Sequence, residues 1–306
     1  MTSNPIELTT ADGYVLGATR YSPDVQPHAR LVVAGATAVP QGFYKRFAEF
    51  ATSRGFEVLT FDYRGIGRSH PGSLKNFRMD LLDWGRLDLA VAVDAMADPQ
   101  VPLFIVGHSF GGHAFGLLPN HQKVAGFYVF GTGAGWHGYM PKGERLRVLM
   151  MWNVVLPVLT WWKGYCPWKM LKMGEDLPID VYRQWRHWCR FPHYFFDDPA
   201  MRGIERGYAD VRTPIVAANA LDDLWAMPAS RDAFVQGYRN APLTCKDLNP
   251  ALTGGKIGHM GYFRQSATPH WEEALAWFAS LSLSAEAARC PPTVLASPDA
   301  PPQQRG

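Results

Sequence analysis

The chain has 306 residues, of which 47% are hydrophobic and 19% charged, a balance typical of a globular protein and not of a disordered or fibrous one. Thirty basic against 27 acidic residues leave a formal net charge of +3, so charge alone indicates no nucleic-acid partner. The four cysteines, Cys166, Cys189, Cys245 and Cys290, have no C-x-x-C spacing, so we expect reduced thiols in a cytoplasmic protein and neither a metal site nor a disulfide framework.

The first element expected along the chain is a β-hairpin. Residues 6–21 alternate in polarity on both sides of Asp12-Gly13, a dipeptide that favours a tight turn. Before this hairpin, the sequence MTSNPIELTT lacks the basic and apolar regions of a secretory signal, so we expect none.

From residue 30 the pattern changes to short apolar runs that alternate with stretches of helical spacing. The runs, which we interpret as strands, are 31–34, 58–61, 103–106, 127–130 and 215–218. Strands that are apolar throughout, each followed by an amphipathic helix, indicate an α/β fold with a mostly parallel, doubly wound sheet covered on both faces.

This alternation is interrupted between the fourth and fifth strands. Seven of the eleven tryptophans lie between Trp136 and Trp188, together with many Arg, Tyr and Pro residues. We therefore predict a core in two parts, residues 1–135 and 211–284, with a helical cap inserted at 136–210. Residues 285–306 are rich in Pro, Ala, Ser and Gln and are predicted to be a disordered tail.

The cap contains the longest apolar stretch of the chain, residues 148–162. It is shorter than the roughly 20 residues that a membrane span needs, and Asn153 and Pro157 interrupt it. We expect no integral membrane span and place the stretch over the carboxyl edge of the sheet, one face lining a pocket and the other packed under neighbouring helices. Because Arg145, Arg147 and Lys163 flank it, an interfacial helix stays open as an alternative.

The strongest chemical signal is the sequence VPLFIVGHSFGG at residues 101–112. An apolar strand runs into Gly107-His108-Ser109-Phe110-Gly111, which matches the G-x-S-x-G nucleophile elbow. A serine at the tip of a tight strand-to-helix turn needs small residues two positions before and after it. The helix that follows directs its N-terminal N–H groups toward a developing oxyanion. Ser109 is therefore the predicted nucleophile.

A nucleophilic serine needs a base and an acid that orients the base, and in this architecture both come later in the chain. The strand near 214–219 is followed by Asp222 and Asp223, and the next strand by a glycine-rich loop that contains His259. His259 is the predicted base. The usual spacing after the strand favours Asp223 as the acid, with Asp222 left open as the alternative.

These motifs resemble those of the α/β-hydrolase superfamily, in its bacterial lysophospholipase- and serine-aminopeptidase-like branch. The resemblance covers roughly residues 5–283 and is carried by GHSFGG at 107–112, DYRGIGRS at 62–69, the Asp222-Asp223 turn and IGHMGYFR at 257–264. It implies an α/β-hydrolase fold and an oxyanion hole built from the N–H groups of Phe110 and of Ala36. The loop before Ala36 departs from the family's usual His-Gly, and Thr37 is the alternative donor.

We therefore predict a serine hydrolase that cleaves a carboxylic ester through an acyl-enzyme, with no metal and no organic cofactor. The cap tryptophans suggest a small-molecule substrate with an apolar or aromatic acyl group, and we name Trp152 and Trp161 as substrate-binding residues. The alternative that the cap tryptophans only pack the cap against the core stays open. Three alternatives remain: an amidase or peptidase on the same residues, an acyltransferase, and a non-catalytic binding module. A peptidase would need a carboxylate for the substrate amine; the cap offers Glu144, Glu175, Asp197 and Asp198. The sequence leaves the oligomeric state open.

Overall fold

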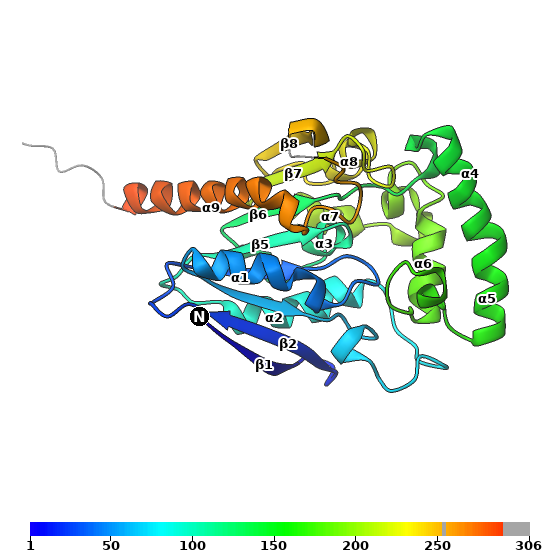
Figure 1. The fold of residues 1–306 in the computed structure, drawn as a ribbon, viewed down its shortest axis with the longest axis horizontal. Helices are drawn as coiled ribbons and strands as arrows, with labels where there is room; N and C mark the ends of the chain where they lie inside the picture. Colours follow the sequence, from blue (N-terminus) through cyan, green and yellow to red (C-terminus); the bar gives the residue numbers. More distant parts are fainter. Residues whose placement is uncertain (253–254, 290–306) are drawn as a thin grey trace, which may run out of the picture.

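The computed structural model describes residues 1–252 and 255–289, and these form one twisted sheet with helices on both faces (Figure 1). The described strands follow the order β1-β2-β4-β3-β5-β6-β7-β8, antiparallel for the first hairpin and parallel from β4 onward. The strands are β1 (Thr2–Thr9), β2 (Val15–Ser22), β3 (Ala29–Ala34), β4 (Phe56–Phe61), β5 (Leu103–His108), β6 (Gly126–Phe130), β7 (Ile215–Ala220) and β8 (Leu243–Leu248).

The predicted fold class is confirmed, and the five apolar runs are β3 to β7. In β5, which lies between β3 and β6, every residue is buried. Leu103 and Ile105 belong to the apolar cluster on one face of the sheet, and Phe104 and Val106 to the cluster on the other. This alternation explains why the central strands have no polar face in the sequence.

Two layers of helices cover the sheet. One face is covered by α1 (Lys45–Ser53) and α9 (Thr268–Arg289), the other by α2 (Ala90–Met96), α3 (Phe110–Phe115) and α8 (Pro228–Val235). A π-helical turn, η3 (Trp84–Leu89), leads into α2. The last helix, α9, continues to Arg289, so part of the segment predicted as a disordered tail is helical; residues 290–306 lie outside the described residues.

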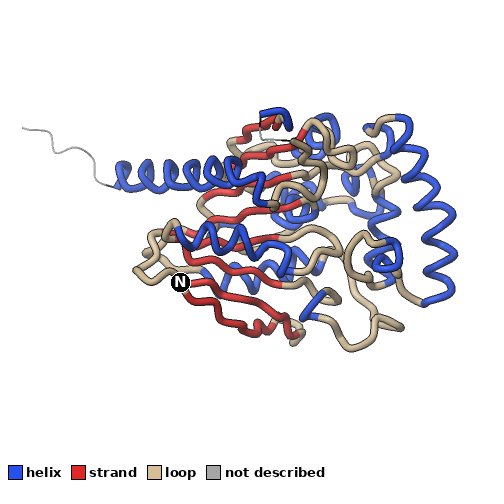
Figure 2. The backbone as a smooth tube through the Cα atoms, viewed as in Figure 1, coloured by secondary structure: helices blue, strands red, loops and turns tan. Residues whose placement is uncertain are grey.

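The interval between β6 and β7 contains helices, and we keep the name cap for residues 136–210. They are α4 (Lys142–Met150), the π turn η6 (Met151–Val155), α5 (Leu156–Lys163), α6 (Ile179–Trp188) and α7 (Ile204–Asp210). Most of these helices stand beyond the carboxyl ends of the parallel strands, whereas the last one, α7, lies beside α3 (Figure 1); Figure 2 shows the same arrangement by type of element. On α7, the buried Tyr208 donates its hydroxyl to the carbonyl of His113 in α3, so the end of this interval packs with the core.

The apolar stretch of the cap does not pack as expected. Together, α4, η6 and α5 form a continuous helical segment whose inner side is buried at Val148, Trp152, Leu156 and Thr160. Its outer side exposes a row of large apolar side chains, which we call the outer stripe: Leu146, Met150, Val154, Val158, Trp161 and Trp162, each between 54% and 86% exposed. In the described part of the chain, no helix is long and apolar enough to cross a membrane.

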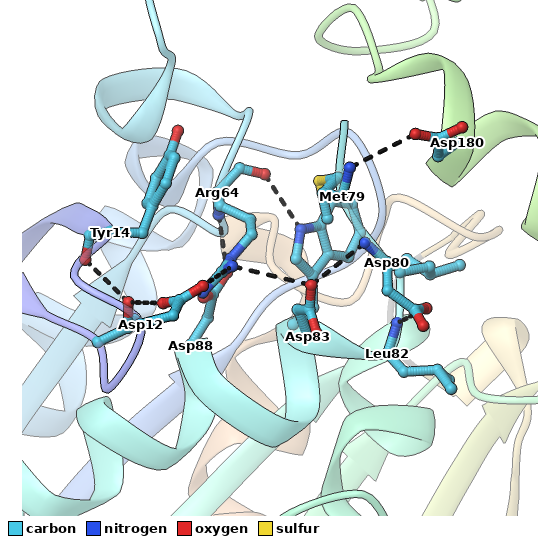
Figure 3. A network of polar contacts seen from close by, with 12 residues as sticks. Asp12, Tyr14, Arg64, Met79, Asp80, Leu82, Asp83, Asp88 and Asp180 are labelled. Carbon is cyan, nitrogen blue, oxygen red and sulfur yellow. Dashed lines mark hydrogen bonds and ion pairs between the residues drawn. The ribbon is translucent and has the colours of Figure 1, made fainter. Parts of the chain in front are cut away.

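The DYRGIGRS segment is held by a buried ion-pair cluster (Figure 3). Arg64 donates to the carboxylates of Asp88 and Asp12, at 2.7–3.2 Å, and lies 3.8 Å from that of Asp83. Asp88 is fully buried, and Trp84 donates its indole N–H to the carbonyl of Arg64. The cluster ties the first hairpin to η3, and the Trp84 ring then packs edge-on against Phe110, beside the predicted nucleophile.

The segment around residues 79–81 also forms hydrogen bonds with the cap. Asp180 at the start of α6 accepts the main-chain N–H of Met79, and Gln184, one turn later, accepts that of Leu81 at 2.7 Å. Because α6 also carries Trp185, these bonds fix the position of a side chain that lines the cavity described below.

Candidate active site

Ser109 lies at the tip of the sharp turn between β5 and α3, with φ of 51° and ψ of −107°. A non-glycine residue adopts positive φ at an energetic cost of roughly 1–3 kcal/mol, and such strain concentrates at functional sites. The turn is held by a hydrogen bond from the Ser109 N–H to the carbonyl of Phe130 in the neighbouring strand.

The glycines on both sides of the serine are required by close packing. A Cβ atom at Gly111 would lie 2.2 Å from the carbonyl oxygen of Ala34, and one at Gly107 would lie 2.9 Å from the ring of Phe127. Both positions therefore exclude a side chain, as expected for the residues two positions before and after a serine in this motif.

The structure brings Ser109, His259 and Asp223 together, from three separate loops at the carboxyl ends of β5, β8 and β7. Ser109 Oγ lies 3.0 Å from His259 Nε2, and His259 Nδ1 lies 2.9 Å and 3.1 Å from the two carboxylate oxygens of Asp223. Asp223 is fully buried, whereas the His259 side chain is 20% exposed. This is the geometry of a nucleophile, a base and an orienting acid.

The neighbouring residue, Asp222, has different hydrogen-bond partners from Asp223. Asp222 accepts the main-chain N–H groups of Ile257 and Gly258, at 3.0 Å and 2.9 Å. It therefore holds the loop that carries His259, while Asp223 contacts the imidazole itself.

Three further residues, Tyr262, Trp225 and Ala226, donate hydrogen bonds to Asp223, and the sequence analysis did not assign them a role. Tyr262 donates its hydroxyl to Asp223 Oδ2 at 2.8 Å. The main-chain N–H groups of Trp225 and Ala226 donate to Oδ1, and the Trp225 ring stacks on His259 with centroids 6.1 Å apart. Tyr262 is part of the IGHMGYFR motif, and Trp225 follows the acid by two residues, so proximity to the motifs was the available signal.

The electrostatics favour an Asp223 anion beside His259. Burial would raise the pKa of Asp223, but His259 and the hydrogen bonds to Asp223 outweigh burial and lower that pKa. Burial likewise disfavours the imidazolium form of His259, but the Asp223 carboxylate outweighs it and raises the pKa of His259 above its usual value. The pair is therefore arranged to stabilise a proton on His259.

His108, the residue before the serine, is buried, and its side chain contacts Tyr44 and the main chain of His259. The Ala36 N–H donates to the Tyr44 hydroxyl at 2.7 Å, that hydroxyl lies 3.0 Å from His108 Nδ1, and His108 Nε2 lies 2.9 Å from the carbonyl oxygen of His259. Burial, assisted by the nearby His259, lowers the pKa of His108 to about 3. If His108 is neutral, accepts at Nδ1 and donates at Nε2, every donor and acceptor in this series of hydrogen bonds has a partner.

These hydrogen bonds decide which of the expected oxyanion donors has an N–H group available. Phe110 is the first residue of α3, so its N–H has no partner within the helix. The Ala36 N–H, in contrast, already donates to Tyr44. Within the described residues, the Thr37 N–H forms no hydrogen bond, and Thr37 lines the cavity beside Ser109. The geometry thus favours the alternative donor, Thr37, over Ala36.

A cavity of about 460 Å³ opens at Ser109 and His259. Its core side is formed by residues of the loop 36–40 and by Phe43, Trp225 and Met260; its cap side is formed by Arg147, Trp168, Lys172, Met173, Gly174 and Trp185. The cavity therefore lies between the core and the cap, at the carboxyl edge of the sheet, where α/β folds bind ligands.

The two tryptophans named from the sequence as substrate-binding do not line this cavity. Trp152 faces inward and packs against Trp168, Tyr182 and Trp185, so it lies behind the cavity wall. Trp161 is 86% exposed on the outer side of α5. The sequence identified the tryptophan-rich cap but could not show which side of this helical segment is buried, because large apolar side chains occupy both sides.

Comparisons with known proteins agree with this fold. The family model described as serine aminopeptidase, S33 (Hydrolase_4) matches residues 25–249. An uncharacterized abhydrolase domain-containing protein of Dictyostelium discoideum is 33% identical over 118 residues, and a provisionally named monoglyceride lipase of Schizosaccharomyces pombe is 34% identical over 107. The matches cover 37% and 33% of this chain but only 12% and 28% of those relatives, so they span a minor part of each.

Solved structures resemble almost the whole chain at low sequence identity. A soluble variant of the monoglyceride lipase of Saccharomyces cerevisiae, in complex with a substrate analogue, has a TM-score of 0.64 at 14% identity, over 91% of this chain and 96% of that one. An esterase of Pyrococcus furiosus has a TM-score of 0.59 at 14% identity, over 92% and 91%. At this identity the similarity supports the fold, while the family model covers most of the chain. The chain therefore belongs to the serine aminopeptidase S33-like family of α/β hydrolases.

Proposed function

We propose that this protein is a serine hydrolase that cleaves carboxylic esters of an apolar acyl group through an acyl-enzyme. The observation that carries the proposal is the hydrogen-bonded series Ser109–His259–Asp223, with distances of 3.0 Å and 2.9 Å, at one end of an apolar cavity. A weakly acidic serine hydroxyl becomes a nucleophile only when a base is positioned to take its proton.

In the proposed reaction, Ser109 Oγ attacks the ester carbonyl while His259 Nε2 takes its proton. The N–H groups of Phe110 and Thr37 stabilise the oxyanion of the tetrahedral intermediate. His259 then protonates the departing alcohol, and a water molecule, activated by His259 in the same way, hydrolyses the acyl-enzyme. Asp223 keeps the proton of neutral His259 on Nδ1 and stabilises the imidazolium that forms in each half-reaction.

The acyl preference is proposed from the walls of the cavity. Phe43, Trp168, Met173, Trp185 and Trp225 present aromatic and thioether groups that a hydrocarbon chain can contact without loss of hydrogen bonds. The names of the matched relatives are consistent with this class, since two of them are described as monoglyceride lipases. The free thiols of the three described cysteines fit the proposed cytoplasmic location.

The experiment that tests this function compares the wild type and Ser109→Ala on 4-nitrophenyl esters of increasing acyl length. The proposal requires that the wild type cleaves them and that the variant retains the fold, by circular dichroism, with activity lowered by roughly a millionfold. Hydrolysis by the variant near the wild-type rate contradicts the proposal. Aminoacyl anilides and added alcohols in the same assay test the amidase and acyltransferase alternatives.

A separate observation, the outer stripe, supports one addition to this function: we propose that the enzyme works while its cap lies on an anionic lipid surface. Single exposed apolar side chains are common on protein surfaces, but six large ones along one helical segment form a patch of the kind that marks an interaction site. Residues 142–190 contain nine Lys and Arg against four Asp and Glu, although the whole chain is only +3. That charge disfavours a second copy of the same face and favours an anionic bilayer.

Sedimentation with vesicles tests this addition. We expect binding to vesicles that contain phosphatidylglycerol, weaker binding to phosphatidylcholine vesicles, and loss of binding in the double variant Val154→Asn/Val158→Asn. The matched control is Val25→Asn, which changes an equally exposed valine (69%) on the core. Equal sedimentation of both variants, or concentration-dependent dimerisation that only the stripe variant loses, contradicts the lipid surface.

A further inference from the structure

The charged residues of the cavity have one sign. Apart from His259, the only charged side chains among the described residues that line it are Arg147 and Lys172, both from the cap. Asp and Glu are absent from the same lining. A site for a substrate amine would need the opposite arrangement, because an ammonium group requires a carboxylate or other acceptor beside it.

The cap carboxylates considered as amine ligands are engaged elsewhere. Glu144 accepts from Arg147 and from the Trp225 indole N–H, and Glu175 pairs with Lys169. Asp197 pairs with His193, and Asp198 accepts from the Trp188 indole N–H and contacts His187. None of these four residues lines the cavity.

Arg147 is held in place and keeps donors available. Its Nε and Nη2 donate to the two oxygens of Glu144, at 3.0 Å and 2.7 Å, and Glu144 is itself fixed by Trp225, the residue that stacks on His259. A guanidinium has five N–H donors, and among the residues that the structure describes none accepts from Nη1 of this exposed side chain, so Nη1 can bind a further acceptor.

Lys172 supplies a charge without a partner. Among the described residues, its ammonium forms no ion pair or hydrogen bond, since the neighbouring Glu175 is paired with Lys169. Its backbone has a positive φ of 54°, a conformation that a lysine rarely adopts. The short 3₁₀ turn η7 (Trp168–Leu171) thus ends on a lysine that is held at the cavity wall in an unfavourable backbone conformation.

We propose that Arg147 and Lys172 bind an anionic group of the substrate, a carboxylate or a phosphate, so that the enzyme selects esters that carry a negative charge and rejects those that carry an amine. The inference rests on the proposed ester hydrolysis at Ser109 and adds the substrate class. Trp168, Met173 and Trp185 line the same cavity and would contact the hydrocarbon portion of the substrate.

Matched pairs of esters test the proposal and locate the charge. The acyl-side pair is 4-nitrophenyl hexanoate and mono(4-nitrophenyl) hexanedioate, which differ in a terminal carboxylate. The alcohol-side pair is 1-decanoylglycerol and its 3-phosphate. We expect the wild type to prefer the anionic member of at least one pair by roughly 10- to 100-fold in kcat/KM, the range expected for charge-assisted hydrogen bonds. The pair that shows this preference identifies the position of the anion.

Variants of two lysines on the same 3₁₀ turn provide the control. Lys172→Gln is expected to reduce the preference to below about 3-fold, and Lys172→Glu to abolish it, because the new carboxylate would offset the charge of Arg147. Lys169→Gln should leave the preference unchanged, because Lys169 is exposed, pairs with Glu175 and does not line the cavity. The preference should also shrink as salt is raised from about 50 mM to about 500 mM.

The outcomes separate this inference from the function on which it rests. The anion site is overturned if neutral esters are cleaved as well as the anionic members of both pairs, or if Lys172→Gln and Lys169→Gln have equal effects. In either case the proposed ester hydrolysis still stands. Absence of hydrolysis for every ester overturns both proposals.

Discussion

The His108 side chain and the His259 main chain are joined by a hydrogen bond of 2.9 Å, from Nε2 of the first to the carbonyl oxygen of the second. On its other side, His108 contacts the Tyr44 hydroxyl, which in turn accepts the N–H of Ala36. His108 therefore connects the loop that carries His259, the proposed base, to the loop that carries Thr37, a proposed oxyanion donor. This connection predicts effects of substitutions that never touch the substrate.

The first prediction concerns Tyr44→Phe. Removal of the hydroxyl leaves both the Ala36 N–H and His108 Nδ1 buried without their partner, which should lower the free energy of unfolding by about 1–3 kcal/mol. The control is Tyr128→Phe, since the Tyr128 hydroxyl is buried without a hydrogen-bond partner among the described residues. Urea denaturation should show a lower midpoint for the first variant alone; equal midpoints would contradict the role assigned to Tyr44.

The second prediction separates the two neighbouring aspartates. Asp223→Asn should lower kcat by roughly 10⁴-fold, because an amide that donates to Nδ1 stabilises the wrong imidazole tautomer. Asp222→Asn should cost about 10-fold or less, because Asp222 contacts only the main chain of the His259 loop. Steady-state kinetics on one ester is sufficient, and the opposite ranking of the variants would transfer the acid role to Asp222.

The third prediction is a pH dependence of kcat/KM. Only neutral His259 can take the proton of Ser109, so activity must fall as pH decreases through the pKa of His259. Burial lowers that pKa, but the Asp223 carboxylate raises it by more, so the acidic limb should have its midpoint above about 6.5. The pH profile of the wild type measures this midpoint directly. A flat profile from about pH 5 to 8 is incompatible with His259 as the base.

The fourth prediction distinguishes the cap tryptophans by position. Trp185→Ala removes a wall of the cavity and should raise KM for long-chain esters by roughly 10- to 200-fold relative to acetate esters. Trp161→Ala, on the exposed side of α5, should leave the same ratio unchanged for esters in free solution. Kinetics on an acyl-length series measures both variants, and an equal effect of Trp185→Ala on all chain lengths would make Trp185 a packing residue only.

The sequence predicted the core of the fold well because its signals are local. Strands such as 103–106 are apolar on both sides since both faces of the sheet are covered, and the glycines around Ser109 are demanded by contacts under 3 Å. The residues Ser109, Asp223 and His259 each follow a strand end, so topology alone brings them to one edge.

The residues that the sequence could not assign depend on long-range packing. Large apolar side chains occupy both sides of the cap helical segment, so periodicity could not show which of Trp152 and Trp161 is buried. Arg147 and Lys172 acquire their position from a fold of the cap that no local pattern encodes. The Ala36 N–H was expected to donate to the oxyanion, and only the structure reveals that it donates to the hydroxyl of Tyr44, eight residues later.

The central claim is that Ser109 is a nucleophile activated by His259, and covalent labelling with a fluorophosphonate measures this most directly. The probe should add to the wild-type protein once, peptide mass mapping should locate it at Ser109, and Ser109→Ala should remain unlabelled. Labelling should become slower below the pKa of His259, because the protonated imidazole cannot take the serine proton. A wild-type protein that stays unlabelled at pH 8, or that is labelled at another residue, would contradict the account.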